Sequence, residues 1–279
     1  SAMYNFPPEA VYDWFEAHSV PLKTEEDLRV FPQSNNGKDI VGVFDRLFEA
    51  SKVRVYLKAN VSCVAKREEI FELTLKDRAE PVLVDRLILT TGGQAYRQTG
   101  STGDGYAFAQ ALGHTITHLA PSLNAFFTRE TWPHQLSGLS FEQATLTTER
   151  TGQPSFTGAF LFTHKGLSGP AVFALSAQVA FEAYDAQHPL LIHIDLFPTL
   201  SVEEVRKNIE HAIQTHPRKQ MITVLGFVMP KSLAQITCQE AMIPPEKHAV
   251  EVSKKDLLRF AEWLKAIPLH VVGRGAGDE

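Results

Sequence analysis

The first third of the chain alternates between amphipathic helical segments and short strand-like runs. Apolar residues recur at helical spacing over 8–18 and 39–50, so each of these segments presents one apolar face. Alternating and β-branched runs after them predict strands over 53–57, 61–66, 70–75, 81–84 and 86–91. This part therefore predicts a mixture of helices and sheet.

A different pattern begins near residue 123. Runs rich in Thr, Phe and Gly, with regularly spaced turns, predict a small barrel or sandwich with strands over 143–149, 155–162 and 190–196. The stretch 170–179 is rich in Ala and Val and predicts a helix packed on that sheet.

The pattern becomes helical at residue 201. Ser201 and Glu204 have the spacing of a capping box, which marks a helix start, and Pro217 ends that helix. Further helices are predicted over 219–225, 231–241 and 256–266, which together form a small bundle. The last apolar run, 268–272, predicts a strand that returns to the barrel.

Composition narrows the possible classes of protein. The 279 residues are 44 % hydrophobic with a net charge of −5, and no apolar run is long enough to span a bilayer. The mild acidity argues against nucleic acid as a partner, because phosphate binding needs clustered Lys and Arg. The cysteines Cys63 and Cys238 are expected to be buried free thiols, which suits a cytoplasmic protein.

The most informative segment is a glycine-rich loop. The apolar run 86–91 stops at Gly92-Gly93, and a second glycine-rich stretch opens a helix over 104–112. A strand, a bare loop and a helix N-terminus together form a geometry that holds anionic ligands. The spacing matches neither the Walker loop nor the first dinucleotide fingerprint, so an ordinary strand-to-helix connection remains an alternative.

Three segments resemble signatures of one bacterial family. Residues 90–106 are similar to A-T-G-G-x-S-Y-P-x-T-G-S-T-G-D-G-Y, with Ala95 and Arg97 in place of Ser and Pro. Residues 158–171 are similar to G-E-L-L-F-T-H-x-G-L-S-G-P-A, and residues 22–34 to L-K-T-E followed by R-V-F-P-x-S. The family is that of the NAD(P)/FAD-dependent oxidoreductases that include aminoacetone oxidases and bile-acid reductases.

The resemblance implies a multidomain α+β or α/β fold. Residues 1–122 would form part of a Rossmann-like FAD domain, 123–200 with 268–274 an inserted small β-barrel, and 201–267 a helical bundle. The Gly-x-Gly-x-x-Gly that carries the FAD pyrophosphate in such proteins is not in this sequence. The chain is therefore expected to be the middle of a longer flavoprotein and to retain no FAD by itself.

The resemblance also implies which residues contact the cofactor, listed here in chain order: Arg29, Gly92, Gly93, Thr99, Gly100, Ser101, Thr102, Gly103, Asp104 and Gly105. Asp104 has an alternative role as the cap of its helix, and Arg29 as a surface ion pair.

Two histidine patterns invite a chemical interpretation. His164 lies in a glycine-rich loop, where it is a candidate for moving protons in catalysis or for a hydrogen-bonded barrel residue. His114 and His118 have the spacing of a zinc pair on a helix, but the β-branched residues between them favour a strand, which holds the rings too far apart. No metal site is predicted.

The predicted function is that of part of a FAD-dependent oxidoreductase acting on a small organic substrate, with NAD(P)H as a possible electron donor. The alternative is a non-enzymatic binding module built on the barrel and bundle. Neither a nucleic-acid nor a membrane partner is expected, and the sequence leaves the substrate and the oligomeric state open.

Overall fold

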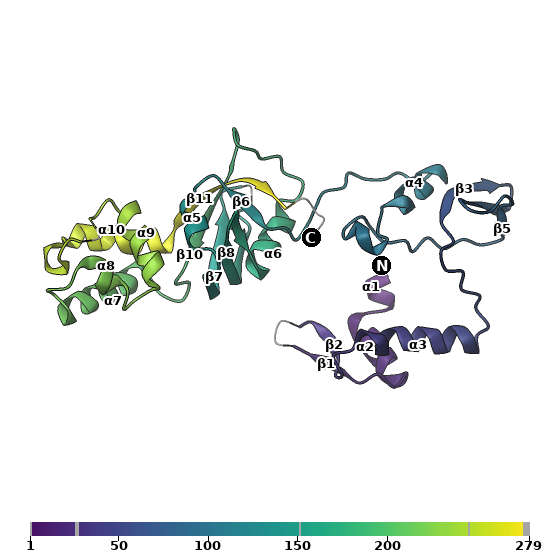
Figure 1. Cartoon of the computed structure of the whole chain (residues 1–279), viewed down its shortest axis with the longest axis horizontal. Coiled ribbons are helices and arrows are strands. Elements are labelled where there is room, and N and C mark those ends of the chain that lie inside the picture. The colour runs from purple at the N-terminus through teal and green to yellow at the C-terminus, as the bar shows by residue number, and fades with distance from the viewer. Residues whose placement is uncertain (1, 26–27, 151, 245, 276–279) are drawn as a thin grey trace. The chain divides into compact units, whose positions relative to one another are not determined.

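The computed structural model describes residues 2–25, 28–150, 152–244 and 246–275 of the chain (Figure 1). It divides into two compact units, Ser1–Leu87 and Ile88–Glu279. Helices, small antiparallel sheets and a closed barrel confirm the predicted mixed α+β class. No helix among the described residues is both long and apolar enough to cross a bilayer.

The described part of the first unit holds helices and two small sheets. The helices are α1 (Ala2–Asn5), α2 (Pro8–Ala17) and α3 (Gly37–Ala50). The strands are β1 (Leu22–Thr24) and β2 (Val30–Pro32) in one sheet, and β3 (Val61–Arg67), β4 (Ile70–Leu75) and β5 (Val82–Val84) in the other. All these pairs are antiparallel, whereas a Rossmann-like core needs parallel strands, so the Rossmann-like domain stays a prediction.

The core of the first unit is small. Val20, Leu22 and Val43 are buried, and Trp14 and Phe15 pack against them. The helix α3 begins where the Asn36 side chain accepts a hydrogen bond from the main-chain nitrogen of Lys38 at 3.1 Å, the usual way of satisfying a free helix donor. Many apolar side chains of this unit remain exposed around that core.

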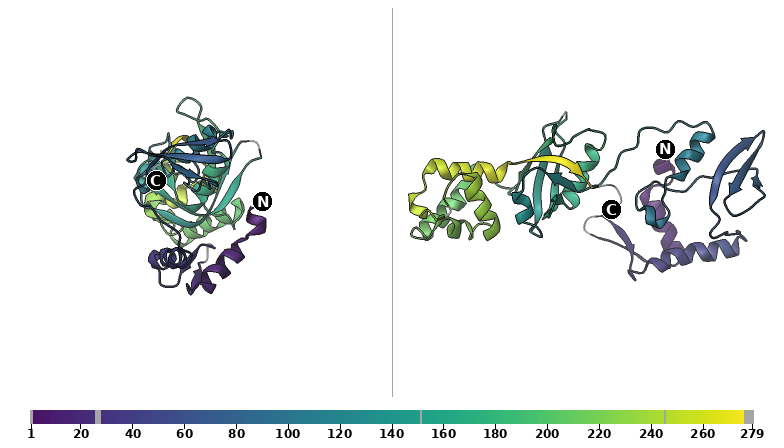
Figure 2. Two further views of the ribbon diagram at one scale, coloured as in Figure 1. Left: turned by 90° about the vertical axis from the view of Figure 1, so that its right-hand side faces the viewer. Right: turned by 45° about the horizontal axis from the view of Figure 1, so that its top comes forward.

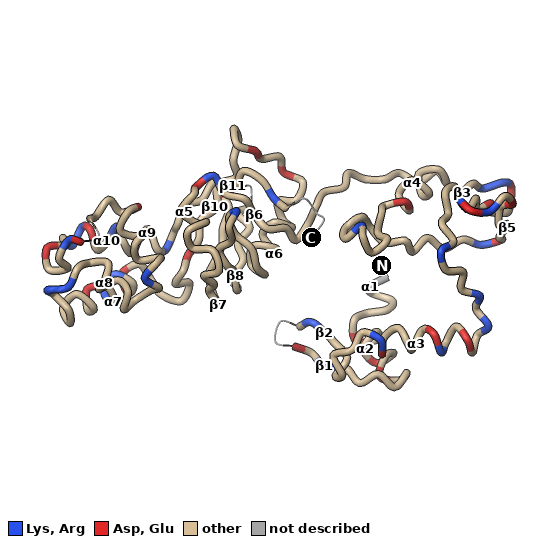
Figure 3. Tube along the Cα trace, in the orientation of Figure 1, with Lys and Arg blue, Asp and Glu red and all other residues tan. Residues whose placement is uncertain are grey.

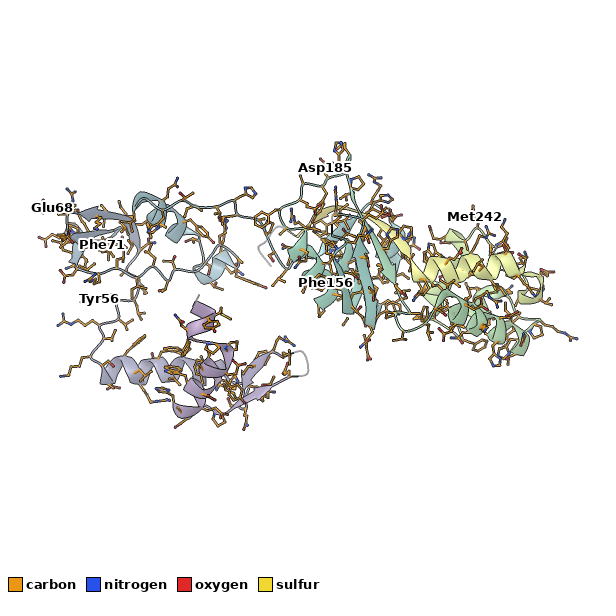
Figure 4. All side chains as sticks on the ribbon, turned by 180° about the vertical axis from the view of Figure 1, so that it is seen from behind. Tyr56, Glu68, Phe71, Phe156, Asp185 and Met242 are labelled. Atoms are coloured by element: carbon orange, nitrogen blue, oxygen red, sulfur yellow. The ribbon has the colours of Figure 1, made fainter. Side chains whose placement is uncertain are left out.

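Two predicted strands are wrong. Residues 53–57 and 86–91 form no strand, although both have strand-like sequences. Val53, Val55 and Tyr56 are more than half exposed, and Figure 4 labels Tyr56 on this segment. A strand needs a neighbour to take its main-chain hydrogen bonds, and no named strand of the structure pairs with either segment.

The second unit contains a closed barrel (Figure 2). The order of its strands is β10-β11-β6-β9-β8-β7. The strands are β6 (Phe126–Thr128), β7 (Ser140–Thr148), β8 (Ser155–Thr163), β9 (Gly166–Ser168), β10 (Leu190–Asp195) and β11 (Ile267–Arg274). The strand β11 pairs with β10 and β6, so the predicted return of the chain to the barrel is confirmed. The short helix α5 (Trp132–Gln135) and the predicted helix, α6 (Pro170–Gln178), both contact β8.

The helical bundle follows between β10 and β11. It consists of α7 (Val202–Thr215), α8 (Met221–Leu225), α9 (Lys231–Glu240) and α10 (Lys254–Lys265). The predicted capping box at the start of α7 is present, with Ser201 and Glu204 bonded reciprocally, and the hydrogen bonds from Ser201 hold the pKa of Glu204 below its usual value. Barrel and bundle share one continuous apolar core, and Lys265 of α10 joins them by an ion pair with Asp195 at 2.6 Å.

The two cysteines differ in reactivity. Cys238 is buried in α9, and burial raises the pKa of its thiol to about 11, whereas Cys63 in β3 is exposed, contrary to the expectation that both are buried. The thiolate is the reactive form, so a maleimide at pH 8 should label one thiol per chain in the native state. Both should react after denaturation, and mass spectrometry of the labelled peptides identifies them. Labelling of Cys238 in the native state would contradict its burial.

Candidate flavin-binding site

The glycine-rich loop turns sharply before helix α4 (Asp104–Ala111). Gly92, Gly100 and Gly103 have φ angles of +72°, +99° and +86°, which residues other than glycine rarely adopt. A single turn of 3-10 helix over Arg97–Thr99 lies between them. The strand expected before the loop is not formed, but the expected turn and helix are.

Three glycines let the loop pack closely on the start of α4. A Cβ atom at Gly105 would collide with the Thr91 side chain, and one at Gly103 would lie 3.3 Å from the Cβ of Gln94. At Gly93 a Cβ would lie 3.3 Å from the Tyr106 hydroxyl. Residues 91–94 therefore lie directly against the first turn of the helix, and packing accounts for part of the glycine pattern.

Two glycines leave the main chain without side chains near the start of α4. A Cβ at Gly100 would meet nothing within 4 Å, and Gly103, the residue before the first turn, has no side chain with which to cap the helix. In the first turn of α4 the Tyr106 N–H donates to the Gly103 carbonyl at 3.0 Å, while among the described residues the N–H groups of Asp104 and Gly105 make no hydrogen bond. These two groups lie at the positive end of the helix. A helix end of this kind is a common binding site for anions such as phosphate. Asp104 is the first helical residue and does not fill the capping position.

The hydroxyl residues of the loop have different roles. The Thr99 hydroxyl donates a hydrogen bond to the Tyr96 carbonyl at 2.7 Å, which closes the 3-10 turn. Thr102 is exposed, and Ser101 is half-buried beside Gly92. Thr99 therefore shapes the loop, while the Thr102 hydroxyl lies at the surface.

Arg29 lies in the first unit, just before β2, and the other predicted contacts lie in the second. Its guanidinium forms an ion pair with Glu25 at 3.3 Å and lies 5.6 Å from the centre of the Phe31 ring. This is the ion-pair alternative weighed from the sequence, and an exposed pair of this kind contributes little to stability.

An apolar groove beside Arg29 was not predicted. It has a volume of about 940 Å³ and lies within the first unit between α2, the β1–β2 sheet and the start of α3. Its lining includes Leu22, Val30 and Phe31 from the segment 22–34 that carries a family signature. In the sequence, the groove is marked only by the Phe, Val and Tyr residues that line it. Such residues are equally typical of a buried core.

His164 is exposed in the tight turn between β8 and β9. The carbonyl of the next residue, Lys165, accepts a hydrogen bond from the main-chain nitrogen of Thr128. The Lys165 ammonium lies 5.3 Å from the centre of the Phe127 ring. Among the described residues the His164 imidazole makes no hydrogen bond, so the structure does not support the structural alternative considered for it.

The zinc-like histidine pair is neither helical nor extended in a strand. Residues 114–120 form no regular element, and the His118 ring lies 5.9 Å from that of Phe181. Within the described ranges, no three His, Cys, Asp or Glu residues come together in a way that could hold a metal ion.

The family assignment rests on the part of the chain that forms the barrel and the bundle. Residues 120–278 match the family model described as "HI0933-like protein barrel and H2TH domain". The chain belongs to this family. Its barrel strands and the four helices named above lie within the matched residues.

Three curated relatives are similar over most of the chain. A "Ribosomal RNA dihydrouridine synthase" of Haemophilus influenzae is 30 % identical over 77 % of this chain and 52 % of its own length. The protein of the same name in Escherichia coli is 26 % identical over 88 % of this chain and 58 % of its length. A "3-dehydro-bile acid delta(4,6)-reductase" of Clostridium scindens is 24 % identical over 73 % of this chain and 49 % of its length. The chain thus spans about half the length of the relatives it matches.

Proposed function

We propose that this chain is part of a FAD-dependent oxidoreductase and that its glycine loop contacts the cofactor. The observation that carries the proposal is the N-terminus of α4, which no side chain caps because Gly103 precedes it. Membership of the family and the bile-acid reductase among the relatives support it. FAD, when bound, would supply the hydride for the reaction.

The relatives' names suggest one reaction class. One name describes reduction in a 3-dehydro bile acid, and the other describes formation of dihydrouridine, in which the C5–C6 double bond of uracil is saturated. In both substrates the ring double bond is conjugated to a carbonyl group. We propose the same class here: one carbon of such a double bond receives a hydride and its neighbour receives a proton.

Different residues of this chain would bind the cofactor and donate the proton. The N–H groups of Asp104 and Gly105 at the start of α4 would bind phosphate, because no side chain caps this helix end. His164 is our candidate proton donor, since its imidazole is exposed in the turn between β8 and β9 and imidazole is a common acid–base group in enzymes. NAD(P)H remains a candidate electron donor.

The test uses the complete gene product, purified beside residues 1–279. We expect the complete protein to carry the yellow flavin spectrum and residues 1–279 to be colourless, because the sequence has no Gly-x-Gly-x-x-Gly. The complete protein should reduce a conjugated enone or a uridine-containing RNA when given NAD(P)H. His164→Gln should keep the flavin spectrum and slow turnover by about tenfold or more. A complete protein without flavin would refute the proposal.

A further inference from the structure

One stretch of the bundle lacks acidic residues. From His211 to Gln239 the sequence contains no Asp or Glu, although the whole chain has a net charge of −5. The same stretch contains Arg218, Lys219 and Lys231. Figure 3 shows the Lys and Arg positions of the bundle in blue and its Asp and Glu positions in red. The acidity of the whole chain therefore does not describe this part of its surface.

An exposed aromatic ring lies among these cations. Phe227, just after α8, is 56 % exposed. The His216 ring stacks with it at 4.4 Å between centres, and the Lys219 ammonium lies 4.8 Å from its centre. Histidine, lysine and phenylalanine thus form one aromatic and cationic cluster.

Main-chain contacts add two more basic residues to this cluster. The segments 216–220 and 247–250 pair: the Ala249 nitrogen donates to the Lys219 carbonyl at 2.9 Å, and Gln220 and His248 form an antiparallel bridge. The His248 Nδ1 lies 3.1 Å from the Arg218 carbonyl. Lys247 and His248 are therefore held beside Arg218 and Lys219.

Three Lys or Arg residues of this cluster face two acidic residues of the same loop in the sequence. Glu251 accepts a hydrogen bond from the His248 nitrogen at 3.3 Å, so its carboxylate takes part in the turn. Glu246 is the other carboxylate in this loop. We call the cluster of basic and aromatic residues the Phe227 patch: His216, Arg218, Lys219, Phe227, Lys247 and His248.

We propose that the Phe227 patch binds unpaired RNA. This deepens the proposed function and rests on it, because it makes a base in RNA the substrate among the conjugated carbonyl compounds. Unpaired RNA is recognised by aromatic rings that stack on bases and by cations that contact phosphates, and the patch combines both. An acidic peptide would use the cations but would gain nothing from an exposed ring. Two of the relatives are named as ribosomal RNA enzymes, which favours the same partner.

Fluorescence anisotropy of residues 1–279 with a labelled uridine-rich RNA of about twelve nucleotides tests this proposal. Arg218→Glu combined with Lys219→Glu should weaken binding about tenfold and lower the slope of log K against log salt by about 1.4, because two phosphate contacts are lost. Phe227→Ala should weaken binding about fivefold, and Phe227→Trp should restore it.

The matched control carries the same charge change in the first unit. Lys52→Glu with Arg54→Glu replaces two exposed cations and should change RNA binding less than about threefold, since long-range charge effects are screened by salt. Equal losses in both double variants, or full binding by Phe227→Ala, would overturn the patch. Competition by polyglutamate as strong as that by RNA would also overturn it, in favour of an acidic protein partner.

This experiment separates the patch from the proposed function because it needs no cofactor. RNA binding that depends on Phe227, in a complete gene product without flavin, would retain the patch and refute the oxidoreductase. A flavin enzyme that reduces a small enone and binds no RNA would retain the oxidoreductase and overturn the patch. Circular dichroism melting curves of each variant exclude unfolding as the cause of lost binding.

Discussion

Gly166→Ala is expected to destabilise the second unit by about 4 kcal/mol, which is exceptional for the addition of one methyl group. Gly166 is the first residue of β9 and pairs with Phe127 of β6. A Cβ there would collide with the Phe126 carbonyl and lie 3.0 Å from the Thr128 nitrogen, and the φ angle of +150° already excludes most side chains. Because β6 is itself held between β9 and β11, it cannot move away without breaking the closed barrel.

Gly138→Ala is the matched control for this variant. Gly138 also has a positive φ of +89°, but a Cβ there would meet nothing within 4 Å, so only backbone strain of about 1–2 kcal/mol is expected. Thermal unfolding followed by tryptophan fluorescence measures both, since Trp132 and Trp263 belong to or pack on the core of this unit. The Gly166 variant should melt about 8–16 °C below the unchanged chain. Equal shifts in the two variants would show that strain alone, and no collision, sets the cost.

The barrel was predictable because its sequence is locally consistent. The strands β7, β8 and β10 have long alternating runs that bury one face, which fixes both their existence and their approximate limits. The capping box at Ser201 marks the start of the bundle for the same reason, since a local hydrogen-bond pattern decides it. The three-residue strands β6 and β9 were missed because so short a run has no periodicity.

The first unit was harder to predict because strand pairing depends on distant neighbours. Residues 53–57 and 86–91 have strand-like composition, but a strand forms only where another strand takes its hydrogen bonds. Cys63 was expected inside for its residue type, yet it lies on an exposed face of β3. Neither outcome can be read from a local window of sequence.

In the candidate site, too, the sequence predicts the local features and misses the contacts between segments. The sequence places the turn and the helix start at Gly103, because glycine and helix signals are local. It does not show that Gly93, Gly103 and Gly105 also serve the packing of residues 91–94 on α4, which is a contact between segments. The groove beside Phe31 was missed because exposed and buried aromatic residues have the same sequence signature.

Gly103→Ala in the complete gene product should weaken FAD binding by at least about thirtyfold, a loss of roughly 2 kcal/mol. Alanine at a φ of +86° is strained, and its Cβ would press on Gln94, so the first turn of α4 must rotate or shift. The main-chain N–H groups would then no longer converge on the phosphates. Flavin fluorescence during titration with FAD measures the change.

Gly113→Ala separates loop geometry from general damage to the same helix. Gly113 lies just past the other end of α4 with a φ of +90°, and a Cβ there would meet nothing within 4 Å. Its backbone strain is therefore nearly that of the Gly103 variant, while its distance from the first-turn N–H groups is the length of the helix. We expect less than about threefold loss of FAD affinity from Gly113→Ala, since strain there leaves those groups in place. Similar losses in both variants would mean that helix stability, and no phosphate contact, explains the glycine at position 103.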